Sequence, residues 1–592
     1  MDHRASNTES VSAPPRWLLF LALTLTGAGQ ALISPPLNWW WLLPVLWLPG
    51  LWALSHLSGL YAFVGGWWLG TSSLLAIFYW VVHTVKTFSN LPTSVAVVVL
   101  VAFSLFWGFY AAIFAWGLRS IRRVAADHWP WAAAAWFVAC EYLNPQLFPF
   151  YQGVVLYQQT SIFLVTALLG VPFLSFMALA ANGLLLQAWE RRRTGLPVFD
   201  APIKRGVLIW LGLVLFSAGY SWDRDARITE AEAEAESSRV AMVQTNRGVE
   251  ELRRLRKKGP MAQVDDFSSL SRQALRQDES IDVVVWAEGA LRGHAKHPSS
   301  RSARRLVRDF DVELWTGGGS WKKLDDGRRV FHNSAFRLHR GEEGQVLDDE
   351  RYDKRILLPF GEFMPLDWLL PVLRKIQGVG NYQPGDGVLV LDTPHGHISF
   401  LICYEAIRHR YVREAVQRGA DILVNITYDA WFGDTSNPTQ HLMLSALQSA
   451  QYGVPLVRSA TTGISAVTDA RGRLVDTGPL FERMVLTADV PRVNVSSPYR
   501  WTGDLFAWLC IAFSAFGIWQ GRVAGRRWGR RRSFVMATMT IGTACIPLLS
   551  WLANPHILLG DWLAWGLALT TLVVLWVEQV RLRLRLSGEE TS

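Results

Sequence analysis

Cysteine is scarce in this 592-residue chain, which contains four, and only Cys403 lies outside the apolar regions. The other three are Cys140, Cys510 and Cys545. A single thiol in the soluble-like part excludes a disulfide framework there, and the spacing excludes a Cys-x-x-Cys metal site. We therefore expect no metal site there, and the lone thiol is more informative as a reactive group than as a cross-link.

Charged residues are also few: 18% of the chain, against 50% hydrophobic residues. The shortage is uneven, because 17–222 and 502–580 carry few charges whereas 223–500 has the composition of an ordinary soluble α/β domain. The net charge of +9 could serve nucleic-acid binding, but the arginines cluster beside apolar runs, which is typical of membrane topology. We therefore expect a membrane protein with no nucleic-acid partner.

Long hydrophobic runs are plentiful, and ten of them approach the length of about 20 residues that a helix needs to cross a bilayer. Seven precede the soluble-like region and three follow it: 17–34, 39–55, 59–82, 93–118, 130–143, 160–188, 206–222, 502–521, 534–553 and 557–579. The first run lacks a small-residue cleavage site, so we interpret it as a retained span and not as a signal peptide. The sequence thus predicts a membrane bundle over 1–222, a catalytic domain over 223–500 and a second membrane part over 501–592.

Four basic clusters indicate the orientation of these spans. They follow the fourth span, separate the sixth from the seventh, and follow the eighth and the tenth: Arg119, Arg122, Arg123; Arg191, Arg192, Arg193, Lys204, Arg205; Arg522, Arg526, Arg527, Arg530, Arg531, Arg532; Arg581, Arg583, Arg585. With the N-terminus inside, all four clusters fall on the cytoplasmic face, as the positive-inside rule requires. The domain over 223–500 then lies on the opposite side of the membrane.

Within that domain, short β-prone runs alternate with helical patterns. The predicted strands are 239–243, 281–286, 312–316, 398–402, 422–426 and 455–458, and the predicted helices are 268–277, 411–418 and 439–452. Residues 466–475, with Arg471-Gly472 in the middle, predict a hairpin. Residues 224–238, rich in alanine and glutamate, are interpreted as a linker or a short helix.

The strand predicted at 398–402 ends in Cys403, and Tyr404 and Glu405 follow at once. A thiol at the end of a buried strand is held rigidly, as a nucleophile should be. Taken alone, Cys403 is better explained as a core residue, because free cysteine is among the most buried residue types. Two segments upstream reverse that preference.

A carboxylate and an ammonium group come from these segments. The hydrophobic strand at 281–286 delivers Glu288, and apolar surroundings raise a carboxyl pKa enough for it to act as a general base. Lys354 enters an apolar segment, where a cation is costly unless it is used. Each residue alone is more often a solvated surface group. Together, Glu288, Lys354 and Cys403 supply the base, the oxyanion stabiliser and the nucleophile of acyl transfer through a thioester.

Glu288, Lys354 and Cys403, in this order, resemble the triad of the nitrilase, or carbon–nitrogen hydrolase, superfamily. A domain of this kind between membrane spans resembles the apolipoprotein N-acyltransferases, and the resemblance extends to about residue 521. Further matching pieces are Leu358-Pro359-Phe360-Gly361-Glu362, Tyr404-Glu405, Asp429-Ala430-Trp431-Phe432-Gly433-Asp434, Pro438, Gln440-His441, Arg458 and Thr462-Gly463-Ile464.

The resemblance implies an α-helical membrane bundle joined to an αββα sandwich, in a bacterial inner membrane with the sandwich facing the periplasm. It implies a monomer that uses no cofactor. Cys403 would take an acyl chain from a phospholipid as a thioester, and the N-terminal amine of a diacylglyceryl-cysteine apolipoprotein would accept it. Glu362 would be a second carboxylate beside the triad, Tyr404 and Glu405 would shape the pocket, the backbone N–H of Tyr404 would help form the oxyanion hole, and Trp431 would support the substrate.

Several positions depart from the family's pattern: Tyr428 replaces Asn, Gln448 and Gln451 replace Arg and Glu, and Thr461 replaces Asn. These departures leave the acceptor open, so a divergent acyltransferase that acts on another amine is an alternative. A membrane-tethered amidase or nitrilase would use water as the acceptor. A transporter with a sensory domain is a third class, for which Glu141 would be the main intramembrane ionisable residue.

Residues 363–373 are too apolar for a free surface loop. They predict a lid that dips into the membrane interface, and packing against the membrane bundle would explain them equally well. Together with the many spans, this stretch argues against an amidase with a soluble substrate, because such a substrate needs neither.

Overall fold

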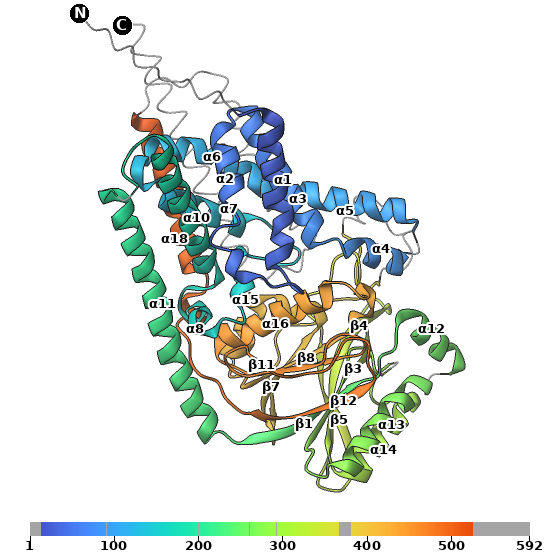
Figure 1. The fold of residues 1–592 in the computed structure, drawn as a ribbon. Helices are drawn as coiled ribbons and strands as arrows, with labels where there is room; N and C mark the ends of the chain where they lie inside the picture. The colour runs from blue at the N-terminus through green and yellow to red at the C-terminus, as the bar shows by residue number, and fades with distance from the viewer. Residues whose placement is uncertain are drawn as a thin grey trace, which may run out of the picture.

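A helical region and an α/β domain make up the protein (Figure 1). The computed structural model describes residues 14–89, 91–198, 200–259, 261–291, 293–365 and 380–524. The helical region comes first, two sheets with their helices follow, and the last two described helices pack back on the helical region. Apolar helices joined to an α/β domain are the architecture that the sequence predicts. The predicted ninth and tenth spans, and most of the predicted lid at 363–373, lie outside the described residues.

The helices of the first region are mostly short. In chain order the elements are α1 (Arg16–Ile33), η1 (Trp40–Leu42), α2 (Leu48–His56), α3 (Leu60–Ile77), α4 (Val81–Ser89), α5 (Thr93–Trp107), α6 (Phe109–Val124), η2 (Ala126–His128), α7 (Trp129–Leu143), η3 (Gln152–Leu156), α8 (Thr160–Phe163), α9 (Thr166–Leu169), α10 (Val171–Arg193) and α11 (Ala201–Glu234). Helical segments that are long and apolar enough to cross a bilayer occupy five of the seven predicted positions: Arg16–Ile33, Leu60–Ile77, Thr93–Arg123, Val171–Arg193 and Ala201–Glu234. The third of them combines α5 and α6, which a turn at Gly108 separates.

The other two predicted positions hold shorter helices. The run at 39–55 contains only η1 and the nine-residue α2, because Pro44 cannot donate a backbone hydrogen bond and Pro49 stands where a new helix begins. The run at 130–143 corresponds to the 15-residue α7. The predicted run at 160–188 is divided at Gly170, whose φ of +73° ends α9; a side chain there would also collide with the Tyr499 ring.

Helix α11 links the two regions as one 34-residue helix. It passes straight through the boundary predicted at 222 and through most of the predicted linker. Its second half is fastened to the α/β domain by arginines. Arg224 donates to the Val495 carbonyl at 2.8 Å, and buried Arg471 forms ion pairs with Asp225 and Glu232. These contacts explain why a stretch that looks like a linker in the sequence continues as a helix.

The α/β domain contains two six-stranded sheets. One has the order β12-β1-β2-β3-β4-β5 and the other β11-β10-β9-β8-β7-β6. The strands are β1 (Ser237–Gln244), β2 (Val283–Trp286), β3 (Glu313–Lys323), β4 (Arg329–Arg340), β5 (Val346–Asp353), β6 (Leu391–Thr393), β7 (Gly396–Ile402), β8 (Ile422–Thr427), β9 (Leu456–Ala460), β10 (Ala466–Thr468), β11 (Leu474–Thr477) and β12 (Met484–Pro491). Strands β1–β3 and β7–β9 are parallel. Parallel strands direct their carboxyl ends to one edge, where sites form in such folds.

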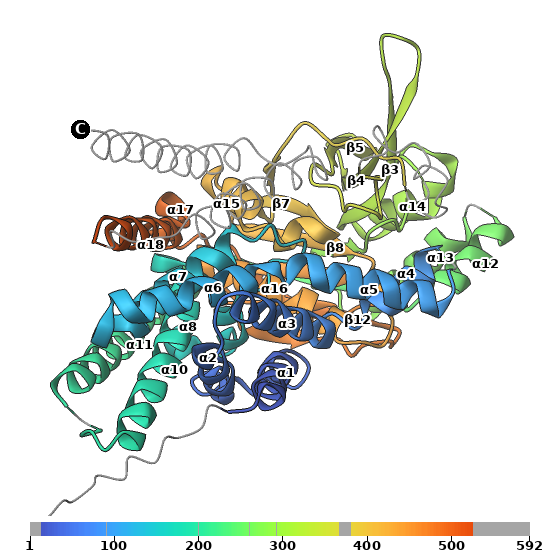
Figure 2. The ribbon, with the colours of Figure 1, turned by 90° about the horizontal axis from the view of Figure 1, so that it is seen from above.

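Helices α13 (Ala262–Gln277) and α14 (Arg301–Phe310) pack on one sheet, and α15 (His409–Gln417) and α16 (Asn437–Tyr452) lie against the other. Helix α12 (Val249–Lys258) packs on α13, and α17 (Tyr499–Thr502) and α18 (Leu505–Ala524) follow the sheets. Helix α16 lies between the sheets and the helical region (Figure 1). Helices α5 and α4 of the helical region extend over the α/β domain in both views (Figures 1 and 2). One buried apolar cluster, which includes Phe163, Leu174, Phe400 and Ile426, crosses the junction.

Candidate active site

The three predicted catalytic residues follow the ends of three strands. Glu288 comes two residues after β2, Lys354 directly follows β5, and Cys403 directly follows β7, where it begins the short helix η6 (Cys403–Ile407). The turn at Glu288 packs tightly on β3 because Gly317 lies beneath it; a side chain at Gly317 would meet the Glu288 backbone. The strand ends therefore bring the three residues to one place.

A hydrogen-bonded cluster joins Glu288 to Lys354. The side-chain amide of Asn333, on β4, donates to Glu288 Oε1 at 2.7 Å and to Glu362 Oε1 at 2.8 Å. Glu362 Oε2 lies 2.7 Å from Lys354 Nζ. The backbone N–H of Tyr428 donates to Glu288 Oε2 at 3.1 Å. Glu362 therefore lies beside the triad, as predicted for a second carboxylate, and Asn333 links the two acids.

Burial and neighbouring charges shift the pKa values of Glu288 and Lys354. The Glu288 pKa is raised, chiefly by burial, although Lys354 and the Asn333 hydrogen bond oppose the shift. Only 1% of the Lys354 side chain is exposed. Burial lowers the Lys354 pKa, but Glu362 and Glu288 outweigh burial, so the pKa of Lys354 is raised and the ammonium stays charged. A fixed cation beside a carboxyl of raised pKa suits a site where negative charge develops during the reaction.

The backbone of Cys403 has an unusual conformation. Its φ is +53°, in the left-handed region that residues other than glycine rarely adopt. The side chain is partly exposed. Burial raises the pKa of the thiol, the Glu288 charge adds to the rise, and Lys354 opposes it. We expected Lys354 to favour the thiolate; it acts in that direction, but burial outweighs it, so the resting thiol is protonated and needs a base.

Glu405 ties two catalytic segments together. Its Oε1 accepts from the backbone N–H groups of Arg355 at 2.8 Å and Ile356 at 2.9 Å, directly after Lys354, and from the Tyr352 hydroxyl. Its Oε2 accepts from Ile402 N–H at 2.9 Å, directly before Cys403. Burial raises the Glu405 pKa to about 7. Glu405 thus fixes the position of Lys354 relative to Cys403 from within the protein interior.

The other two supporting residues contact the helical region. The Tyr404 hydroxyl donates to the Leu147 carbonyl at 2.5 Å, so its side chain is used for docking. Trp431, in the short helix η7 (Asp429–Phe432), stacks on Phe88 of α4 with 4.0 Å between ring centroids. These contacts hold the helical region against the loops that carry the site.

A fully buried charge network lies behind Cys403. Asp429 Oδ2 lies 2.6 Å from Arg458 Nη2, and Asp429 Oδ1 accepts from Thr427 Oγ1 at 2.9 Å. Burial raises the Asp429 pKa, but Arg458 and His441 outweigh burial and hold it well below its usual range. His441 lies between this pair and the Cys403 carbonyl, 3.4 Å from Nε2. The network joins β8, β9 and α16 beneath the nucleophile.

Asn333 is the cluster residue that the sequence reasoning missed. It lies within the β-prone run Phe331 to Phe336, and a buried amide in the middle of such a run is the available signal. No candidate strand was assigned there. Among the described residues, no group of three or more His, Cys, Asp or Glu side chains is arranged to hold a metal ion.

Comparison with known proteins identifies the family of this chain. The carbon-nitrogen hydrolase family model matches residues 239–498, and the model of the apolipoprotein N-acyltransferase N-terminal domain matches 26–184. The apolipoprotein N-acyltransferase of Geobacter metallireducens is 32% identical over 531 residues, which cover 87% of this chain and 97% of that protein. This chain belongs to the apolipoprotein N-acyltransferase family. The apolipoprotein N-acyltransferase of Vibrio vulnificus is 26% identical over 75% of this chain and 85% of its own.

A solved carbon-nitrogen hydrolase from Helicobacter pylori G27 aligns over 43% of this chain and 89% of its own, with 17% identity and a TM-score of 0.33. Membership of the apolipoprotein N-acyltransferase family confirms the predicted family and reaction class, so the protein is an acyltransferase with a carbon-nitrogen hydrolase domain. Its apolar helices and its family make it a membrane protein.

The positions that depart from the apolipoprotein N-acyltransferase pattern have distinct surroundings. Tyr428 serves Glu288 through its backbone N–H, so the change of side chain leaves this contact intact. Gln448 and Gln451 are buried in α16, and the side-chain oxygen of each has no hydrogen-bond partner among the described residues. Thr461 accepts from Asn246 N–H at 2.7 Å through its backbone carbonyl. None of these side chains belongs to the Glu288–Lys354 cluster.

Proposed function

We propose that this protein transfers an acyl chain from a phospholipid, through a Cys403 thioester, to the N-terminal amine of a diacylglyceryl-cysteine apolipoprotein. It works as a monomer in a bacterial inner membrane, with the α/β domain on the periplasmic side. The observation that carries the proposal is the cluster of Glu288, Asn333, Glu362 and Lys354 beside the strand end that bears Cys403.

In the first step, Glu288 takes the proton of the Cys403 thiol, and the sulfur attacks the ester carbonyl of the phospholipid. The Lys354 ammonium stabilises the negative charge that develops on the carbonyl oxygen. The ester C–O bond breaks, Glu288 returns the proton to the leaving oxygen, and a lysophospholipid departs. The raised pKa of the Glu288 carboxyl makes it a better proton acceptor for this step than an ordinary glutamate.

In the second step, the amine of the acceptor attacks the thioester carbonyl. Glu288 takes a proton from the attacking nitrogen, the C–S bond breaks, and the proton returns to the Cys403 sulfur. The product is an amide, and Lys354 again stabilises the oxyanion. Glu362 keeps the Lys354 side chain in place, since its carboxylate lies 2.7 Å from the ammonium.

Intact-mass measurement tests the proposal directly. Incubation with phospholipid alone should add one acyl mass to the wild-type protein, and hydroxylamine should remove it, as expected for a thioester and not for an amide. Cys403→Ala should gain no mass and have no transferase activity, and Cys403→Ser should be nearly inactive. Lys354→Ala and Glu288→Gln should block the first step.

The acceptor is tested in the same experiment. Acylated wild-type protein should lose its acyl mass to a diacylglyceryl-cysteine peptide and not to water or to a simple amine. Release to water at the same rate would support the amidase alternative, and equal use of another amine would support a divergent acyltransferase. Transferase activity of Cys403→Ala near the wild-type level would disprove the covalent mechanism.

A further inference from the structure

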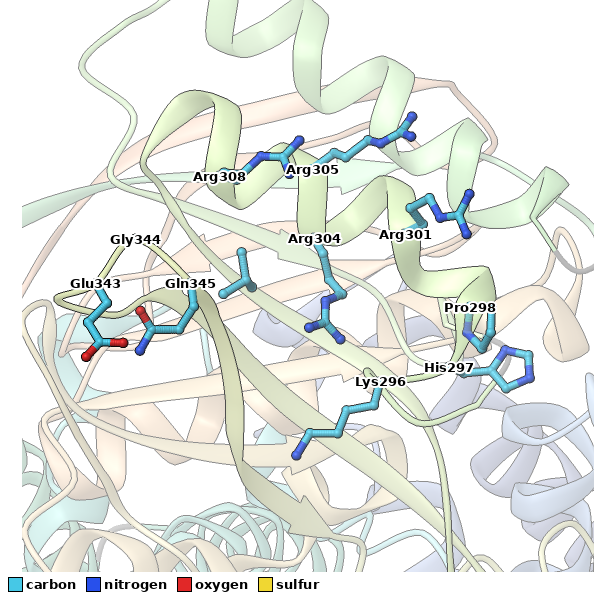
Figure 3. A pocket seen from close by; sticks show the side chains of 11 residues that line it. Lys296, His297, Pro298, Arg301, Arg304, Arg305, Arg308, Glu343, Gly344 and Gln345 are labelled. Atoms are coloured by element: carbon cyan, nitrogen blue, oxygen red, sulfur yellow. The ribbon is translucent and has the colours of Figure 1, made fainter.

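A basic hollow lies on the α/β domain, and none of its lining residues belongs to the proposed catalytic cluster. It has a volume of about 750 Å³ and lies between α14, the segment that precedes α14, and the β4–β5 turn. The lining residues that matter here are Lys296, Arg301, Arg304, Arg305, Arg308, Glu343 and Gln345. Figure 3 shows the arginines of α14 on one side of the hollow, with Glu343 and Gln345 on the other.

The arginines follow a helical spacing. They occupy positions i, i+3, i+4 and i+7 of α14: Arg301, Arg304, Arg305 and Arg308. This spacing places all four on one face of the helix, and Lys296 adds a fifth cation. The face repels itself unless a counter-charge is present, because like charges at these spacings disfavour one another.

Counter-charges from the protein are few. Lys296 Nζ lies 3.5 Å and Arg304 Nη1 4.0 Å from the buried carboxylate of Asp348, both longer than a good hydrogen bond. Arg308 pairs with its neighbour Asp309 at 3.4 Å, whereas within the described chain neither Arg301 nor Arg305 forms an ion pair. Elsewhere in the domain, buried Arg337 has two carboxylate partners, Glu313 and Glu350. Arg301 and Arg305 therefore keep their hydrogen-bond donors available, and Arg304 makes only a long contact.

These features fit an anionic ligand of a particular kind. Guanidinium groups bind phosphate through two parallel hydrogen bonds, and the hollow is within the size range of small-molecule pockets, roughly 300–1,000 Å³. At 1.5 Å per residue, the row from Arg301 to Arg308 extends over about 10 Å. A single phosphate cannot contact the whole row, whereas a molecule with two or more phosphate groups can.

The position of α14 excludes one source of phosphate. The helix lies at the end of the α/β domain away from the helical region (Figure 1), so the headgroups of the bilayer that this region crosses do not reach it. We propose that the hollow is a binding site for a soluble molecule that carries two or more phosphate groups. This proposal is independent of the transferase mechanism.

Tripolyphosphate is the probe for this site. The full-length protein, in nanodiscs of phosphatidylcholine, should bind it with one-to-one stoichiometry in isothermal titration calorimetry at 0.15 M salt. Arg301→Gln with Arg305→Gln should weaken binding at least tenfold. Arg301→Lys with Arg305→Lys should weaken it less, because ammonium groups keep the charge but lose the paired donors. The matched control is Arg254→Gln with Arg276→Gln, which removes two exposed arginines outside the hollow and should bind as the wild type does.

Four outcomes of the calorimetric experiment would overturn the proposal. They are no binding at 0.15 M salt, equal weakening in the control pair, unchanged affinity in a Gln pair whose thermal unfolding matches the wild type, and binding of hexaglutamate but not of tripolyphosphate. Arginine-dependent attachment to phosphatidylglycerol vesicles without tripolyphosphate binding would likewise overturn it, in favour of a lipid headgroup.

Discussion

The Cys403 thiol and the Glu288 carboxyl are neighbouring, partly buried groups, and desolvation raises the pKa of both. A neutral thiol needs a base, and the neighbouring glutamate becomes a stronger base as its pKa rises. Lys354 opposes both shifts, while Glu362 keeps it charged. The four side chains therefore hold one fixed positive charge at the point where the reaction creates a negative one.

Asn333 should control the pH dependence of this site. Its amide donates to Glu288 Oε1 at 2.7 Å, which stabilises the ionised carboxylate and lowers its pKa. Asn333→Ala removes this bond, so the Glu288 pKa should rise further, by about one unit for a charge-assisted hydrogen bond. Because the base must be ionised, the acid limb of kcat/KM against pH should move up by the same amount.

The control for this measurement is Ser334→Ala. Ser334 is the next residue on β4, points to the opposite face of the strand and donates to Asp353 at 2.6 Å. In the Ser334→Ala variant, the acid limb of kcat/KM against pH should stay at the wild-type position. An unmoved limb in Asn333→Ala would mean that the group titrating there is not Glu288.

At the scale of elements, the buried pair of Asp429 and Arg458 joins η7 to β9 behind the nucleophile. Arg458→Met should leave the Asp429 carboxylate buried without its cation. Such a loss costs about 3–5 kcal/mol in buried pairs, so the thermal unfolding midpoint should fall by about 10 °C. Adding Asp429→Asn should recover part of that loss. Arg473→Met removes a half-exposed guanidinium from Asp469, whose carboxylate keeps Arg471 and two backbone N–H donors, and should shift the midpoint little. An equal shift in both variants would contradict the argument.

Helix α4 should influence the use of lipid donors. It belongs to the helical region, yet its Phe88 stacks on Trp431 of η7, 4.0 Å away, next to the Asp429 network. Phe88→Ala removes an aromatic pair worth about 0.5–1.5 kcal/mol, so KM for a long-chain phospholipid should rise roughly two- to tenfold. A soluble short-chain ester should be used as before. Phe106→Ala, on the exposed face of α5, is the control, and an equal effect there would remove the special role of α4.

Strands and helices whose apolar residues form a clear run or repeat could be predicted from the sequence. Each of the six predicted strands overlaps an observed strand, each of the three predicted helices overlaps an observed helix, and the 466–475 hairpin is β10–β11. Strands β4, β5, β6 and β12 were not assigned, because their charged residues hide the alternation; β4 and β5 also pair over a register shift. Asn333 was missed for this reason. Glu405 was found, but its role as a tie between two segments depends on contacts 50 residues apart.

At the scale of the whole molecule, the helical region and the sheets share one continuous apolar core, and α11 connects them covalently. The part of α11 up to Trp222 is mostly apolar and exposed, and Leu208, Leu215 and Trp222 are 67%, 71% and 77% exposed. The remaining part begins with Asp223 and pairs with Arg471 of the α/β domain. A surface of this kind lies in lipid along the part up to Trp222 and in water beyond it.

The last prediction follows from α11 and concerns membrane topology. Gly195 precedes α11, next to Arg191, Arg192 and Arg193, and the exposed turn at 324–328 lies in the domain that α11 enters. Since one helix separates the two sites, alkaline phosphatase inserted near residue 325 should be active, as in the periplasm, and the same reporter near Gly195 should be inactive. A cytoplasmic green fluorescent protein reporter should give the reverse pattern. Activity of the phosphatase at Gly195 but not at 325 would invert the orientation, and with it the side of the membrane on which Cys403 meets its substrates.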